Sequence, residues 1–115
     1  MGTEVDDPVR IFFDMGDLHD AEVRSASWSM ESRQLIVEID DVYAAIDDDD
    51  LPPVSATIRF TETTGIAQEP KFSDQVVSEF RVEELGDRRW RGEFIAKSGD
   101  RLIFGFSGAI VEVST

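Results

Sequence analysis

The strongest constraint on the fold is an alternation of apolar and polar residues with a period of two. Between Val54 and Phe60 every second residue is apolar, and serine, threonine or arginine stands between them. The segment 34–40, QLIVEID, repeats the pattern with leucine, valine and isoleucine on one side. Because successive side chains of a strand point to opposite faces, this period predicts strands that bury one face.

Polar turns between the alternating segments predict hairpins. Residues 21–29, AEVRSASWS, and residues 34–40 flank the polar stretch MESR. A Gly-Asp pair follows residues 76–85 and another follows residues 90–97, and the sequence alternates again over residues 102–113. Gly-Asp between alternating segments is a hairpin signal, so we expect the C-terminal half to form three antiparallel strands in succession.

These patterns predict an all-β fold, either an antiparallel sandwich or an open, curled barrel of about six to eight strands, with at most one short helix. We expect residues 1–115 to form a single domain in which residues 1–8 are flexible. Residues 9–13, VRIFF, are expected to add a strand or to pack as an arm. Residues 40–46, DDVYAAI, are the one plausible helical turn elsewhere.

Two segments leave alternatives open. Residues 73–85 fit a helix because their apolar residues also recur at helical spacing, but the β-branched content and the following turn favour a strand. Such a strand places Val76 and Val77 on opposite faces. In the last segment Gly105 and Gly108 offer positions for a bulge or a sharp coil.

Charge and composition exclude several classes of function. The chain has 25 acidic and 11 basic residues, a net charge of −14, which steers it toward basic surfaces and disfavours nucleic acids and anionic membranes. It has no cysteine, so thiolate chemistry, disulfides and cysteine metal sites are excluded. The N-terminal segment lacks the pattern of a secretory signal, and no apolar run approaches the length of a membrane helix. We therefore expect a cytoplasmic protein.

The stretch GDLHDAEV holds the single histidine, His19, close to three acids, Asp17, Asp20 and Glu22. A metal or catalytic site is one interpretation, but common zinc sites use several histidines or cysteines. Alternation also separates His19 from Asp20 and Glu22 if all three lie in a strand. The favoured interpretation is a loop-to-strand junction in which a short aspartate side chain accepts backbone hydrogen bonds.

A run of four aspartates is the second place where a cation could bind. Carboxylate oxygens attract Ca²⁺ or Mg²⁺, yet the run and the residues after it do not match an EF-hand loop. A solvated loop is therefore favoured, and we expect no metal and no cofactor. The run comprises Asp47, Asp48, Asp49 and Asp50.

Neither nucleophilic catalysis nor a phosphate site is indicated. GFSGA, around Ser107, does not match the G-x-S-x-G nucleophile elbow, and its place within the last alternating segment suggests a small strand residue. The glycines are scattered and none opens a helix. Paired acids carry little information, because 25 carboxylates will meet any spacing by chance.

One basic island stands out on this acidic chain, where three arginines surround Trp90. Arginine and tryptophan are enriched at the energetic centres of protein interfaces. The alternative is a hairpin turn whose arginines pair with nearby glutamates. The arginines are Arg88, Arg89 and Arg91, and the candidate glutamate partners are Glu83, Glu84 and Glu93.

The segment from Leu18 to Thr61 resembles small uncharacterised bacterial proteins that carry an L-H-D-[SA] motif near the N-terminus. The match lies in LHDAEVRSASWSMESRQLIVEID and the later ATIRFT. Those families often continue with Gly-Val, whereas this chain continues with TETTGIA. Some relatives with this pattern are grouped with immunity proteins of bacterial toxin systems. The resemblance implies a β-rich fold and no established catalytic residues.

These observations lead to three functional hypotheses. The first is a non-enzymatic β-sheet protein that binds a protein partner, presenting acidic surface to a basic target, with an immunity-type role as its sharpest form. The alternative is a small β-barrel that binds an apolar ligand between its sheets. A metal-assisted hydrolase that uses His19 and the aspartate-rich loop is the least favoured.

Overall fold

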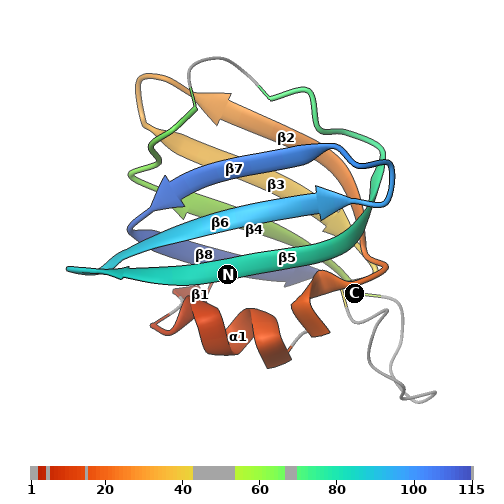
Figure 1. The fold of residues 1–115 in the computed structure, drawn as a ribbon, viewed down its shortest axis with the longest axis horizontal. Helices are drawn as coiled ribbons and strands as arrows, with labels where there is room; N and C mark the ends of the chain where they lie inside the picture. Colours follow the sequence, from red (N-terminus) through yellow and green to blue (C-terminus); the bar gives the residue numbers. More distant parts are fainter. Residues whose placement is uncertain (1–2, 5, 15, 43–53, 67–69, 115) are drawn as a thin grey trace.

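The computed structural model describes residues 3–4, 6–14, 16–42, 54–66 and 70–114. In this part of the chain eight antiparallel strands form one open sheet in the order β1-β8-β4-β3-β2-β5-β6-β7 (Figure 1). The strands are β1 (Thr3–Glu4), β2 (Glu22–Ser29), β3 (Gln34–Asp40), β4 (Ser55–Thr61), β5 (Gln75–Gly86), β6 (Arg89–Ala96), β7 (Arg101–Phe106) and β8 (Gly108–Ser114). A helix, α1 (Pro8–Asp14), and a 3-10 turn, η1 (Gly16–Leu18), precede β2.

The sheet has two halves that face each other. Strands β1, β8, β4, β3 and β2 form one half, and β5, β6 and β7 form the other. The halves are joined where the first residues of β2 pair with the start of β5, Glu22 with Val76 and Val23 with Gln75. In Figure 1, β6 and β7 lie across β3 and β4. The expected all-β antiparallel class with at most one short helix is confirmed.

Phenylalanine rings fill the space between the halves. The ring of Phe60 on β4 lies 4.8 Å from that of Phe104 and 4.9 Å from that of Phe106, both on β7. The rings of Phe80 and Phe94, on β5 and β6, stack at 4.0 Å. All five side chains are at most 1% exposed. Aromatic pairs of this kind add to the free energy gained by burying apolar area, so this cluster contributes to the stability of the contact between the halves.

Residues 9–13 are helical, so the prediction of a strand or an arm there is wrong. Asp7 caps the helix, because its Oδ1 accepts a hydrogen bond from the backbone N–H of Arg10 at 3.2 Å. Pro8 occupies the first helical position, where its fixed φ suits a helix. The helix then buries Phe12, whose ring meets that of Phe80 edge-on at 4.8 Å.

Residues 75–86 form a strand, as favoured, and Val76 and Val77 lie on opposite faces as expected, but the alternation does not continue unbroken through the segment. The pairing of β5 with β6 shifts register between Val77 and Glu79, which marks a bulge. Val77 and Phe80 are therefore both fully buried, while Val76 is 41% exposed. An alternation read straight through the segment misses the extra residue.

The last alternating segment is two strands. The break is at Ser107. Before it β7 pairs with β6, and after it β8 crosses to the other half of the sheet and pairs with β4. This crossing allows Phe104 and Val111 to be buried in the same core although they are of opposite parity in the sequence. The expected succession of three antiparallel strands corresponds to β5, β6 and β7 and is confirmed.

Some expectations fall outside the part that is described. Residues 43–53 are not described, so most of the expected helical turn at 40–46 is not placed; its first residue, Asp40, ends β3. Within residues 1–8, Thr3 and Glu4 pair with β8. Of the helices in the described ranges, none has the length and apolar character that a membrane span requires.

Candidate functional site

The histidine segment folds as a tight junction between η1 and β2. Asp17, Leu18 and Asp20 have φ angles of 54°, 56° and 66°, in the left-handed region that few non-glycine residues adopt. The buried side chain of Leu18 anchors the segment. Its backbone is tied to β5, since the N–H of Asp20 donates to the carbonyl of Val77 at 2.9 Å and the N–H of Val77 donates to the carbonyl of Ala21 at 2.7 Å.

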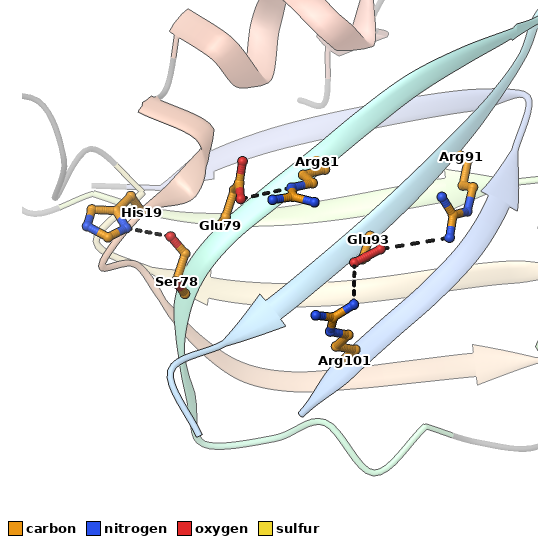
Figure 2. A network of polar contacts seen from close by, with 7 residues as sticks. All are labelled: His19, Ser78, Glu79, Arg81, Arg91, Glu93 and Arg101. Carbon is orange, nitrogen blue, oxygen red and sulfur yellow. Dashed lines mark hydrogen bonds and ion pairs between the residues drawn. The ribbon is translucent and has the colours of Figure 1, made fainter. Parts of the chain in front are cut away.

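His19 binds the carbonyl at the β5 bulge. Its Nδ1 lies 2.5 Å from the carbonyl oxygen of Ser78 (Figure 2). A carbonyl can only accept, so Nδ1 carries the proton and donates. The other ring nitrogen, Nε2, faces Oδ2 of Asp20 at 3.6 Å, and Asp20 is also ion-paired with Lys97. The histidine thus connects the junction to β5.

The two aspartates beside His19 have opposite electrostatic environments. The hydrogen bond from Lys97 lowers the pKa of Asp20, and the charges of His19 and Lys97 act in the same direction. Partial burial, reinforced by the nearby charge of Glu79, raises the pKa of Asp17. No ion pair joins Asp17 to another described residue. Its carboxylate is therefore partly desolvated beside another carboxylate, and no cation of the described residues pairs with it directly.

The four residues singled out in the histidine segment do not converge on one point. Glu22 is exposed at the start of β2, where its neighbours in the ladder are Asp40 and Val76. Across the described ranges, no three histidine, aspartate or glutamate side chains are placed to hold a metal ion. Asp47, Asp48, Asp49 and Asp50 lie outside the described residues.

A groove of about 400 Å³ runs along β5, and we call it the acidic groove. Its charged lining consists of four carboxylates and two arginines. By alternation Glu79, Arg81 and Glu83 share one face of β5, but nothing local in the sequence joins that face to the loop that carries Asp17. The groove is lined by Asp17, Glu79, Phe80, Arg81, Val82, Glu83, Arg91 and Glu93.

Glu93, which lines the acidic groove, is at the centre of a network of ion pairs. This carboxylate is only 7% exposed although it belongs to the outer face of β6. Its Oε1 lies 3.4 Å from Nη1 of Arg101 and its Oε2 lies 3.8 Å from Nη2 of Arg91 (Figure 2). On β5, Nε of Arg81 donates to Glu79 at 2.9 Å. With these pairs and that of Glu83 with Arg91, Asp17 is the one carboxylate of the groove's lining that has no cation partner among the described residues.

The basic island around Trp90 is divided between two faces. Trp90 points to the interior and stacks on Phe106 at 6.0 Å. Arg91 lies on the outer face, where it pairs with Glu93 and with Glu83 at 3.9 Å. These two glutamate partners are among those expected from the sequence. The four residues therefore do not form one continuous patch, because neighbours in a strand point in opposite directions.

The two remaining arginines of the island lie at the β5–β6 turn. Arg89 donates to the carbonyl of Glu62 at 2.9 Å and to Oγ of Ser107 at 3.1 Å. Ser107 in turn donates to Glu62 Oε2 at 2.5 Å, so its hydroxyl is held in a carboxylate–arginine network. Arg88 is exposed at the tip of the turn with a φ of 58°.

Comparison with known protein families, curated proteins and solved structures finds no match to this chain.

Proposed function

We propose that this protein is a non-enzymatic binding module whose acidic groove docks a basic segment of a partner protein. The observation that carries the proposal is the environment of Asp17. Its half-buried carboxylate lies beside Glu79 without an ion pair to a described residue, and its pKa is raised by burial and by that neighbour. A lysine or arginine from a partner would relieve this repulsion, because an opposite charge favours the ionised carboxylate.

The charge of the whole chain supports the same partner class. A net charge of −14 attracts basic proteins over long range and increases their rate of encounter. The same charge disfavours a nucleic acid or an anionic membrane as the partner. The ring cluster between the two halves of the sheet supports this proposal over the alternative, an apolar ligand held between the sheets.

The sharpest form of the proposal is an immunity-type role in the cytoplasm, in which the groove neutralises a basic toxin. The net negative charge and the L-H-D-[SA] resemblance support this form of the proposal. Co-expression with a basic protein encoded beside this chain tests it, with growth of the host as the readout. Reduced protection is expected in the Glu83→Gln variant, and protection equal to that of the parent at matched, low expression would contradict a role for the groove.

Binding of a basic peptide to the acidic groove is tested directly by NMR titration. ¹⁵N-labelled protein is titrated with an acetylated, amidated five-residue glycine peptide that carries two arginines, and with the same peptide carrying two glutamates. Amide shifts are expected at Asp17 and along residues 79–83 with the arginine peptide alone. The affinity is expected to fall as salt is added, because these charges are screened.

A pair of variants with equal change in charge provides the control. Glu83→Gln removes a carboxylate from the groove, and Glu112→Gln removes an exposed one from β8. Glu83→Gln is expected to weaken binding by up to about fivefold, the effect of one exposed ion pair. Equal weakening by both variants would show attraction to net charge alone and would overturn the proposal.

A further inference from the structure

An apolar groove of about 360 Å³ adjoins the acidic groove on the outer face of β5–β7. Its walls include Leu85 and Ile103, which are 56% and 41% exposed. Phe104 and Gly105 contribute to its lining, and Arg91 lines both grooves. Exposed aliphatic side chains gathered in a hollow differ from single surface leucines, because together they offer a concave apolar contact.

The rim of the apolar groove is held by specific contacts. The backbone of Thr64 exchanges two hydrogen bonds of 2.9 Å with Gly105. Nη2 of Arg89 also donates to Oγ1 of Thr64 at 3.0 Å. Gly105 leaves no room for a side chain, since a Cβ atom there would overlap Thr64 Oγ1. A contact surface fixed in this way loses little conformational entropy when a ligand binds.

We propose that the two grooves bind one extended segment of the partner, in which a basic residue and an apolar residue are two positions apart. The basic side chain enters the acidic groove and the apolar side chain enters the apolar groove. This inference rests on the proposed function and specifies the partner's motif.

The spacing follows from β5 itself. Glu83 lines the acidic groove and Leu85 lines the apolar groove, two positions further along β5, where the ladder with β6 shifts register again between Glu84 and Gly86. A chain spans at most about 7 Å between residues two positions apart, and a bulge does not lengthen that span. Side chains two positions apart in an extended peptide share a face at the same spacing, so one peptide can reach both grooves. A second copy of this chain is disfavoured as the occupant because each copy carries a net charge of −14.

Synthetic peptides test the motif on the intact protein by NMR titration. The probes are acetylated, amidated glycine peptides that contain Arg-Gly-Leu, the reverse order Leu-Gly-Arg, the adjacent pair Arg-Leu, or Arg-Gly-Ser. The tighter-binding of the Arg-Gly-Leu and Leu-Gly-Arg peptides is expected to bind about tenfold more tightly than the Arg-Gly-Ser peptide. This factor corresponds to the lower end of the free energy gained by burying a leucine side chain. The adjacent pair is expected to bind no better than the serine peptide.

Two variants test whether the higher affinity of the leucine peptides comes from the apolar groove. Leu85→Ser is expected to remove the advantage of leucine while leaving the affinity for the serine peptide unchanged. Val113→Ser, at a residue of β8 that is 45% exposed, removes a comparable apolar side chain from the other half of the sheet and is expected to change neither affinity. The amide spectrum of each variant verifies its fold.

The outcomes separate this inference from the proposed function. Equal binding of leucine and serine peptides, a gain that survives Leu85→Ser, or equal binding of the adjacent pair would overturn the motif while arginine docking stands. Absence of binding by the arginine-containing peptides would overturn both.

Discussion

The imidazole Nδ1 of His19 lies 2.5 Å from the carbonyl oxygen of Ser78, the residue at the bulge of β5. A bulge withdraws one residue from the ladder and leaves its backbone groups without strand partners. The histidine satisfies that carbonyl from a segment 59 residues away in the sequence. The single histidine therefore has a structural contact, and it links the η1–β2 junction to the strand that carries the acidic groove.

Replacing His19 is expected to destabilise the fold modestly. His19→Ala removes the donor to Ser78, and we expect a loss of about 1 kcal/mol in the free energy of unfolding, the net value of one hydrogen bond. Urea unfolding followed by tryptophan fluorescence measures it. His19→Gln, whose amide can donate to the same carbonyl, is expected to retain part of the stability. An alanine variant as stable as the parent would show that the contact contributes nothing.

Asp17→Asn is expected to stabilise the protein at neutral pH. Burial and the charge of Glu79 raise the folded-state pKa of Asp17 above its ordinary value of 3.8, so ionisation is less favourable in the folded than in the unfolded chain. In the parent protein the favourable contribution of Asp17 to the free energy of unfolding is therefore fully present below pH 3.8, and it is lost as the pH rises through the raised folded-state pKa. Asparagine also tolerates the left-handed backbone of this position.

Thermal unfolding of the parent and of Asp17→Asn at several pH values tests whether the substitution stabilises the protein at neutral pH. The gain at pH 7 is expected to stay below about 1 kcal/mol, because solvent screens a half-exposed carboxylate. The two melting temperatures should converge in acid. A variant that is less stable than the parent at pH 7 would contradict the electrostatic environment described for Asp17.

Asp20→Asn is expected to act in the opposite direction. The hydrogen bond from Lys97 holds the pKa of Asp20 below its ordinary value of 3.8, so the contribution of Asp20 to stability is present above that pH. This contribution is lost as the pH falls through the lowered folded-state pKa. The variant should melt below the parent at pH 7 and approach it in acid. Lys97→Met serves as a control, since in its background Asp20→Asn should have a smaller effect.

Gly92 occupies an inner position of β6 where a side chain would press on the aromatic cluster. A Cβ atom there would lie 3.0 Å from Cζ of Phe104 and 3.2 Å from Cε1 of Phe80. Alanine normally favours the folded state over glycine, but the stacked rings leave little freedom to move aside. We expect Gly92→Ala to destabilise the fold by about 1 kcal/mol, and Gly92→Val by more.

A double-variant cycle checks the cause of that loss. Phe104→Leu removes the nearer ring, so the penalty of Gly92→Ala should shrink in the Phe104→Leu background. Additive effects of the two substitutions, measured by urea unfolding, would show that the ring is not what resists the added methyl group.

Residues with a clear local signal behave as their sequence predicts. Alternation locates β2, β3 and β4 within a residue or two, and the Gly-Asp pairs coincide with the turns after β5 and β6. It also implies that Trp90 and Arg91 face opposite sides, as they do. The helix at residues 8–14 had a local signal too, the Asp7 cap followed by Pro8, which the strand-like run of apolar residues concealed.

The acidic groove could not be predicted from the sequence in the same way. Glu79 and Glu83 share a face by alternation, but Asp17 joins them only because η1 packs beside β5. The burial of Glu93 likewise depends on arginines from two positions, one on its own strand and one on β7. Contacts between distant segments leave no periodic pattern in either segment.

Local signals were enough to predict the all-β class, strands β2 to β6 and the strong negative charge, because period, turn residues and ionisable groups act locally or by simple sum. Packing between distant segments decides that Ser78 is left out of the ladder between Val77 and Glu79, that the last segment crosses to the other half of the sheet, and that His19 satisfies Ser78. The physical reason is that these features depend on the partner strand and on packing around Phe60, to which residues far apart in the chain contribute together.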